Sequence, residues 1–357
     1  MSGVGFDRVA FVGAGTMGCY NSLLAALSGY QVVLQDLDAE VLELVPFVHE
    51  AIGAHLISIG YCSEADLKAA YTRVTVETDL ESAVAGVGLV SESVPERLAL
   101  KRDVFAKLEA ICASNTILTS NTSALLISDV DTALQDGNHF AALHSHFGAL
   151  LFDIVAGPRC DSDTVERLER YVRSLKAEPL ILNKEYPGYV FNALLGSVLS
   201  AAKWQVITQN ASFEDIDRAW MARFSASLGP FALMDLFGLD VVFDSWQEQR
   251  DDPVRQQRQP KVLAFLQAYV DEGRLGRKTG AGFYQYPDAT FMQAGFSDNC
   301  EPRFIDPLLT ALFETASKIE AEGVADRADI DRAWRTALGM AQGPFEMQQA
   351  NNQSNNL

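Results

Sequence analysis

Two histidines one residue apart are the side chains whose types and spacing first suggest chemistry. The stretch "LHSHFGALLFDIV" at residues 143–155 holds His144, His146 and, inside an apolar run, Asp153. An imidazole titrates near neutral pH and can act as a general base. The same residue types could hold zinc, but His139 is the only further candidate nearby, and no cluster of carboxylates or cysteines supports a metal. An ordinary strand end is the third alternative, and the stretch alone does not decide among them.

A glycine motif near the N-terminus predicts a dinucleotide site. Gly13, Gly15 and Gly18 follow the strand-like "RVAFV" and open a helical stretch. In such a G-x-G-x-x-G turn the first glycine permits the tight turn, the second lets a pyrophosphate approach the backbone, and the third lets helix and strand pack closely. Thr16 and Met17 stand at the start of the helix, whose N-terminus would face the phosphates.

Asp36 ends the next strand-like run, "QVVLQD", 18 residues after Gly18. A carboxylate at this place accepts hydrogen bonds from the ribose hydroxyls and repels a 2′-phosphate. The sequence therefore predicts NAD, rather than NADP, as the cofactor. The alternative is a glycine turn in a sheet protein that binds no dinucleotide.

The order of the elements around these motifs predicts the fold class. Apolar strands alternate with amphipathic helices through about residue 185, which indicates an α/β Rossmann domain with a doubly wound, mostly parallel sheet. The rest reads as an all-α domain. We expect the NAD-binding domain at 1–185, a helical substrate and dimerisation domain at 186–289, a partial repeat of it at 290–349, and a disordered tail at 350–357.

The repeat is indicated by two short stretches of identical residues. "DIDRAW" at 215–220 recurs at 329–334, and "GPF" at 229–231 recurs at 343–345, both 114 positions further on. Repeats of this kind are one supersecondary unit packed on its twin. We expect the partial copy to pack on the first helical half of its own chain.

Composition excludes some classes of partner. The net charge of −19 lacks the cationic surface that nucleic acid requires. No apolar run reaches the length of a membrane span, and the N-terminus does not look like a secretion signal. Five scattered cysteines without a CxxC pair suit a reducing cytosol. We expect a cytoplasmic protein that does not bind membranes or nucleic acid.

The ordered blocks of the chain resemble the L-3-hydroxyacyl-CoA dehydrogenase family. The likeness runs from residue 8 to about 286 and includes "VAFVGAGTMG", "SESVPERLALKRDVFAKLE", "SNTSAL", "LHSHF", "YPGYVFNALL" and "GRLGRKTGAGFYQY". It implies an NAD-dependent enzyme of fatty acid metabolism that interconverts 3-hydroxyacyl and 3-ketoacyl thioesters, and a helical domain that forms a homodimer. A fused second copy could instead occupy that surface in cis and leave a pseudo-dimeric monomer.

The resemblance also implies roles for individual residues. His144 is the catalytic base, and the acid that orients its ring is Asp153. Ser123 and Asn192 hydrogen-bond near the reacting oxygen. Glu96 and Lys101 match positions that the family uses beside the active site, which we assign to cofactor binding, although a helix-start glutamate and a surface lysine would look the same. His146 falls where the family has a phenylalanine.

Three departures bear on activity and substrate. The family's F-N-P after the histidine is "HFG" here, the acid is an aspartate instead of a glutamate, and the arginine after Asn192 is Ala193. A shorter loop could bring the shorter acid into reach, or the dyad could be broken. Between Arg8 and Lys68 there is also no lysine or arginine to bind CoA phosphates. The missing cations leave a non-CoA 3-hydroxy acid or a carrier-protein thioester as the alternative substrates. The altered residues after His144 leave a catalytically weakened NAD-binding protein as the alternative function.

Overall fold

The computed structural model describes residues 4–209, 211–247, 252–298 and 300–354. The chain divides into two compact units. The first contains residues up to Phe191 together with Ile319–Gly339, and the second contains Asn192–Lys318 and the residues from Met340 onward.

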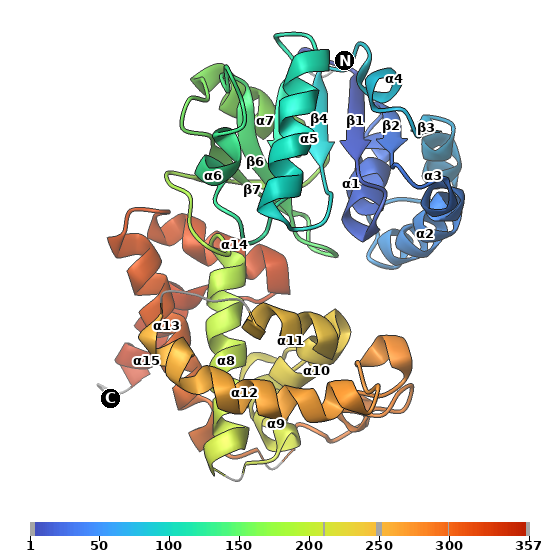
Figure 1. The fold of residues 1–357 in the computed structure, drawn as a ribbon. Helices are drawn as coiled ribbons and strands as arrows, with labels where there is room; N and C mark the ends of the chain where they lie inside the picture. The colour runs from blue at the N-terminus through green and yellow to red at the C-terminus, as the bar shows by residue number, and fades with distance from the viewer. Residues whose placement is uncertain (1–3, 210, 248–251, 299, 355–357) are drawn as a thin grey trace. The chain divides into compact units, whose positions relative to one another are not determined.

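The first unit is built on one eight-stranded sheet (Figure 1). Its spatial order is β3-β2-β1-β4-β5-β6-β7-β8, and every neighbouring pair is parallel except β6 and β7. The predicted α/β Rossmann class is confirmed. The strands are β1 (Arg8–Val12), β2 (Gln31–Gln35), β3 (Val74–Glu77), β4 (Leu89–Glu92), β5 (Ile117–Ser120), β6 (Phe140–Ser145), β7 (Leu151–Ala156) and β8 (Glu178–Leu182).

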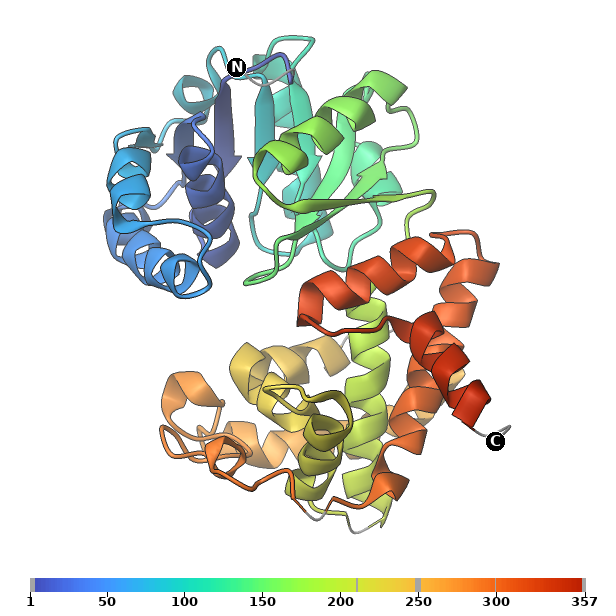
Figure 2. The same ribbon diagram turned by 180° about the vertical axis from the view of Figure 1, so that it is seen from behind.

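Helices cover both faces of this sheet. In Figure 1 α5 lies in front of the central strands, and in Figure 2, which shows the opposite side, α7 lies in front. Strands buried on both faces carry nearly continuous apolar residues, as in "VAFV" and "VVL". The helices are α1 (Thr16–Leu27), α2 (Ala39–Ser58), α3 (Glu64–Tyr71), α4 (Leu80–Val84), α5 (Leu98–Ile111), α6 (Ile127–Asp131) and α7 (Ser162–Ser174).

Helix α2 corrects one expectation. By length and composition it could cross a membrane, although the sequence was expected to contain no such run. Leu42, Val45, Ile52 and Leu56 are buried on the face that joins the core around α1. The apolar character of this face is therefore explained by packing inside the first unit.

The second unit is helical, as predicted. Two buried carboxylates organise it: Asp217 accepts hydrogen bonds from the Phe231 and Ala232 amides at the start of α10, and Tyr284 Oη donates to it over 2.9 Å. Asp235 accepts the amides of Phe283 and Tyr284. The long helices are α8 (Phe191–Gln209), α9 (Phe213–Phe224), α10 (Pro230–Phe237), α11 (Leu239–Gln247), α12 (Pro253–Asp271), α13 (Asp306–Ala321) and α15 (Pro344–Ser354).

The two copies of "DIDRAW" form the same local structure. Helices α9 and α14 (Arg327–Leu338) are both 12 residues long, and each has a side-chain N-cap and a left-handed C-cap. The copies nevertheless pack on different partners. In the second unit the segment before α13 contacts α9, and the Gln205 side chain of α8 donates to the Phe304 carbonyl. Helix α14 instead contacts β7 and β8 of the first unit.

The partial repeat is therefore split between the two units, which differs from the expected single segment on the helical half. The Asn183 amide donates to the Val324 carbonyl, and Arg332 pairs with Glu178 at 3.0 Å. These contacts, with the buried Ile330 and Trp334, attach α14 to the edge of the sheet. The tail also differs, because α15 begins at "GPF", buries Phe345 and Met347, and continues to Ser354. Residues 355–357 lie outside the described residues.

Candidate active site

The hairpin of β6 and β7 brings a histidine and an aspartate together. These strands pair antiparallel with His144 directly opposite Asp153, and directly opposed residues on one face have neighbouring Cβ atoms. His144 Nδ1 lies 3.0 Å from Asp153 Oδ2. An aspartate is therefore long enough, and the substitution for the family's glutamate leaves the pair intact. Both side chains are buried.

The other ring nitrogen of His144 faces a serine. Ser123 Oγ lies 3.0 Å from His144 Nε2, and Ser123 is exposed while the histidine is not. Ser123 follows β5, and His144 is near the end of the parallel neighbour β6. Carboxyl ends of parallel strands are where open α/β sheets place their ligands. The hydroxyl and the imidazole thus converge where a substrate could reach them.

Glu96 fixes the loop that carries Ser123. Its Oε1 accepts the Ser123 and Ala124 amides, both at 2.9 Å, and the Thr122 hydroxyl. Burial would raise the pKa of Glu96, but Lys101 and these hydrogen bonds hold it below its ordinary value. The carboxylate is therefore ionised at neutral pH and acts as an anchor for the loop.

Lys101 lies beneath this loop and is 1% exposed. Its Nζ is 2.7 Å from Glu92 Oε1, 3.3 Å from Glu96 Oε2 and 3.3 Å from the Val94 carbonyl. These contacts use all three ammonium donors. Glu92, which the sequence analysis did not select, is fully buried and also accepts the Ser120 hydroxyl at 2.7 Å. The assignment of Glu96 and Lys101 to cofactor binding stays a prediction. Their observed contacts hold the loop that carries Ser123.

Tyr189 is a second residue that sequence reasoning missed. Its ring stacks on His144 with centroids 4.8 Å apart, and its hydroxyl donates to the Thr122 carbonyl over 2.8 Å. Its φ of 51° lies in the left-handed region, which a non-glycine residue adopts only where surrounding contacts enforce it. The block "YPGYVFN" was the available signal, because it places an aromatic residue just before the predicted Asn192.

Asn192 itself is the second residue of α8 and belongs to the second unit. It is half-buried. Its role at the reacting oxygen stays a prediction.

His146 joins the dyad from the same side of the hairpin. His146 directly follows β6, its amide donates to the Leu151 carbonyl, and its Nε2 lies 2.8 Å from Asp153 Oδ2, the oxygen that His144 also contacts. Potential ligand atoms of the three residues lie within 4.8 Å of one another. The sequence analysis found no carboxylate or cysteine cluster to support a metal, whereas the structure places Asp153 with both histidines in a group of that kind. Both contacts have hydrogen-bond lengths, so a proton on His144 Nδ1 and another on His146 Nε2 satisfy them.

The protonation of this cluster follows from its burial. Burial would raise the pKa of Asp153, but the two imidazoles hold it below its ordinary value. Burial and the neighbouring His146 lower the pKa of His144, against the opposing effects of Asp153 and Glu96. At neutral pH the site therefore contains an ionised carboxylate and a neutral His144, the form that accepts a proton.

The glycine turn fits a dinucleotide. Gly13 has φ of +100°, and a Cβ there would lie 2.7 Å from the Ser93 carbonyl oxygen. A Cβ on Gly18 would lie 1.9 Å from the Gly13 carbonyl oxygen, whereas one on Gly15 would meet nothing within 4 Å. The space in front of Gly15 and the N-terminus of α1 is thus open for a pyrophosphate. Asp36 stands at the end of β2, where the Ala14 amide donates to its Oδ2 over 2.8 Å.

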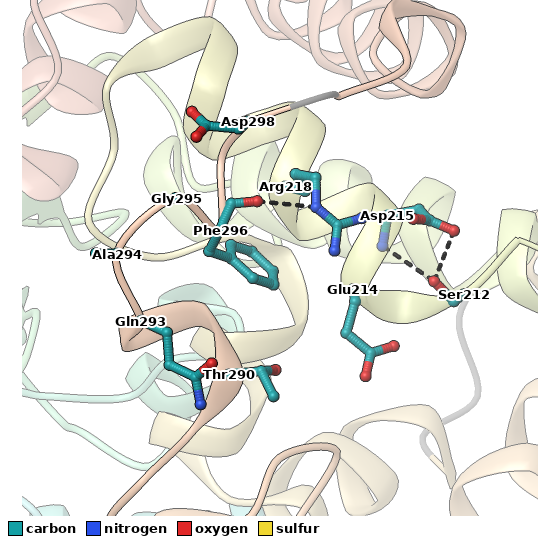
Figure 3. A pocket seen from close by; sticks show the side chains of 10 residues that line it. All are labelled: Ser212, Glu214, Asp215, Arg218, Thr290, Gln293, Ala294, Gly295, Phe296 and Asp298. Carbon is teal, nitrogen blue, oxygen red and sulfur yellow. Dashed lines mark hydrogen bonds and ion pairs between the residues drawn. The ribbon is translucent and has the colours of Figure 1, made fainter.

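The second unit contains a separate pocket of about 670 Å³ (Figure 3). Arg218, one of its charged groups, donates to the Phe296 carbonyl over 2.8 Å and pairs with Asp215 at 2.6 Å. Ser212 caps α9. These contacts assign Ser212, Asp215 and Arg218 to helix capping and loop attachment, and none of the predicted site residues lines this pocket.

A dinucleotide turn, together with a histidine–aspartate pair whose histidine lies near the carboxyl end of β6, indicates a nicotinamide-dependent oxidoreductase. Residues 8–186 match the family described as "3-hydroxyacyl-CoA dehydrogenase, NAD binding domain". The description "3-hydroxyacyl-CoA dehydrogenase, C-terminal domain" matches residues 188–286 and 304–352, which contain the two copies of the repeat. The chain belongs to the 3-hydroxyacyl-CoA dehydrogenase family and is an NAD-dependent oxidoreductase of this type.

Individual relatives agree. The human mitochondrial hydroxyacyl-coenzyme A dehydrogenase is 31% identical over 78% of this chain and 91% of its own length. A diketoreductase structure, described as catalysing reactions of dicarbonyl compounds, is 28% identical with a TM-score of 0.72 and covers 79% of this chain and 99% of its own. The 3-hydroxybutyryl-CoA dehydrogenase of Escherichia coli K12 covers 95% of this chain and 90% of its own, with a TM-score of 0.77 and 23% identity, and shows the shared fold.

Proposed function

We propose that this protein oxidises a 3-hydroxyacyl thioester to the 3-ketoacyl form, or catalyses the reverse reduction, with His144 as the general base. One observation carries this proposal: His144 lies between Ser123 and Asp153. Its Nε2 is 3.0 Å from Ser123 Oγ, and its Nδ1 is 3.0 Å from Asp153 Oδ2. A base must lie within hydrogen-bond reach of the proton that it removes, and the exposed Ser123 hydroxyl marks where a substrate hydroxyl would bind.

Each residue has one task in this scheme. Bound NAD supplies a hydride acceptor at the nicotinamide ring. His144 Nε2 takes the hydroxyl proton, while Asp153 holds Nδ1–H in place and stabilises the imidazolium. Ser123 and Asn192 hydrogen-bond to the substrate oxygen. In the reductive direction the protonated His144 returns the proton to the carbonyl oxygen.

A second substrate class is favoured by a specific observation. The exposed acidic side chains at α2 would repel CoA phosphates, and no lysine or arginine lies between residues 9 and 67. The similar diketoreductase is described as acting on dicarbonyl compounds. A non-CoA 3-hydroxy acid or a carrier-protein thioester is therefore the alternative. The acidic residues concerned are Asp38, Glu40, Glu43 and Glu50.

The two classes are separated by one substrate panel. NADH oxidation is followed with acetoacetyl-CoA, with the same acyl group on pantetheine and on an acyl carrier protein, and with free 3-keto acids. The thioester proposal expects the highest kcat/KM with a thioester, and CoA should exceed pantetheine if its phosphates are bound. Higher kcat/KM with free acids would establish the alternative. If no compound is turned over while NADH binds, the chain is a weakened, NAD-binding member of the family.

We also propose that the protein is a cytoplasmic homodimer that functions in fatty acid metabolism. The family's helical domain supports a dimer, and the partial repeat gives the alternative of a pseudo-dimeric monomer. Light scattering on the full chain decides between one and two copies per particle.

A further inference from the structure

One carboxylate oxygen serves two imidazoles in this site. Asp153 Oδ2 is 3.0 Å from His144 Nδ1 and 2.8 Å from His146 Nε2, and the two rings lie edge to face with centroids 4.5 Å apart. Asp153 Oδ1 is buried and has no hydrogen-bond partner. The second histidine therefore does not use the spare oxygen, and both rings compete for the same one.

We propose that His146 is a positioning residue that competes with His144 for Oδ2 of Asp153 and so makes His144 a weaker base than a single histidine–aspartate pair would contain. This inference rests on the proposed function, in which His144 is the base. It concerns a residue of this chain at a position where the resemblance implied a phenylalanine.

The physical reason is the division of one negative charge. A carboxylate stabilises an imidazolium through the hydrogen bond that it accepts, and a second N–H donor on the same oxygen withdraws part of that charge. A proton on both rings would in addition place two cations side by side. His144 should therefore stay in its proton-accepting form to lower pH, which favours alcohol oxidation near neutrality.

Few other charges of the first unit face this cluster. Glu96 acts on His144 from the loop before α5 and raises its pKa, but it is engaged by Lys101 and the Ser123 loop. Tyr189 stacks on His144, and burial raises the pKa of its phenol far above neutrality, so it stays uncharged. Changes at His146 should therefore reach His144 through the shared Asp153 oxygen and through the direct contact of the two rings.

Packing holds His146 in this position. The Phe191 ring meets the His146 ring edge to face at 5.1 Å, and Trp334 of α14 lies behind Phe191 at 6.2 Å. His146 is 6% exposed and Trp334 is fully buried. The imidazole has little freedom to turn away from Asp153, so the competition is a fixed feature of the folded unit.

The test measures the pKa of His144 directly. Imidazole NMR signals of the full-length protein, labelled in its five histidines, are titrated in wild type, His146→Phe and His146→Gln. His146→Phe removes the competing donor, and the pKa of His144 should rise by about one pH unit, the size expected when a charged hydrogen bond is no longer shared. His146→Gln keeps a neutral N–H donor without a charge, so the rise should be smaller.

Controls make the result specific. His139→Gln removes an imidazole whose partners are Thr164 and Asp161 instead of Asp153. This variant should leave the pKa of His144 unchanged. An unchanged or lowered His144 pKa in both folded His146 variants would overturn the proposal. So would one equivalent of chelator-removable zinc in the purified protein whose loss moves both imidazole signals, because the trio would then be a metal centre.

The titration needs no turnover, so it is separate from the proposed function. If the pKa of His144 rises as expected but no hydroxyacyl or ketoacyl compound reacts, the competition stands and the proposed function fails. In an active enzyme the same variants should move the acid limb of kcat/KM for oxidation to higher pH, whereas a purely structural role would change kcat or KM without moving that limb.

Discussion

Asp153 lies directly opposite His144 across the β6–β7 pair, and its Oδ2 is 3.0 Å from the histidine Nδ1. The sequence left open whether an aspartate, which is shorter than the expected glutamate, could reach His144. The register answers this question, because side chains directly opposite each other on neighbouring strands are already in contact. The altered residues after His144 change the turn and the second imidazole but leave the pair in place.

Asp153→Asn should keep the shape of this buried site and remove its charge. The amide cannot stabilise the imidazolium, and it can favour the wrong tautomer of His144, so turnover should fall on the order of a hundredfold or more. Steady-state rates with the best substrate of the panel, and a thermal melt to verify folding, provide the measurement. Full activity in the variant would show that the carboxylate does not support the base.

Asp36→Ala should weaken NAD binding and reduce discrimination against NADP. The wild-type carboxylate ends β2 beside the Ala14 amide, where it can accept ribose hydroxyls and repel a 2′-phosphate. Titration calorimetry with both cofactors measures the two affinities. A wild-type protein that binds NADP as tightly as NAD would contradict the assignment.

The sequence predicted more of the fold than of the network beneath the site. Alternation of apolar runs, the glycine turn and the ordered family blocks were sufficient for the Rossmann unit and the helical half. The structure also brings Ser123, His144 and Asp153 together, although their roles stay predictions. The register of β6 on β7, which no local pattern specifies, decides that pairing.

Other features depended on tertiary contacts that a sequence pattern does not report. The sequence left a surface lysine as the alternative to a cofactor role for Lys101, but Glu92 and Glu96 allow its ammonium to be buried. Helix α14 shares the sequence "DIDRAW" with α9, yet it packs on β7 and β8. The repeat indicated a helix with an apolar face and could not indicate which surface covers that face.

Trp334→Ala should test that placement through stability. Trp334 is fully buried on α14, and truncating a buried tryptophan costs about 3–5 kcal/mol of unfolding free energy. The half-buried Trp204 of α8 is the matched control, and Trp204→Ala should cost less. Urea unfolding of both variants measures the difference. A Trp334→Ala loss no larger than that of a surface substitution, about 0.5 kcal/mol, would indicate that α14 is not an integral part of its unit.

The buried Lys203 side chain should make the free energy of unfolding depend on pH. It is fully buried in the second unit, with Nζ 3.5 Å from Met234 Sδ, and burial, followed by the nearby Arg255, lowers its pKa from 10.5 to about 7. A lysine pKa lowered by folding means that the unfolded chain binds the proton more tightly. This residue should therefore destabilise the fold increasingly as pH falls from 10.5 toward 7, with the full penalty below 7.

Lys203→Met removes that penalty. The variant should be more stable than wild type at pH 6, and the difference should shrink as pH rises toward 10, as measured by urea unfolding at several pH values. A difference that is the same at pH 6 and pH 10 would show that Lys203 does not titrate in this range.

The most direct test of the account is the turnover of His144→Gln, measured as NADH oxidation with the best substrate of the panel. The account predicts a loss on the order of a hundredfold or more, because the base is removed while the glutamine retains much of the ring's hydrogen-bonding shape. NADH affinity should stay near the wild-type value, and His146→Gln should lose far less turnover. A His144→Gln enzyme as active as wild type, or a larger loss in His146→Gln, would contradict the assignment of His144 as the base.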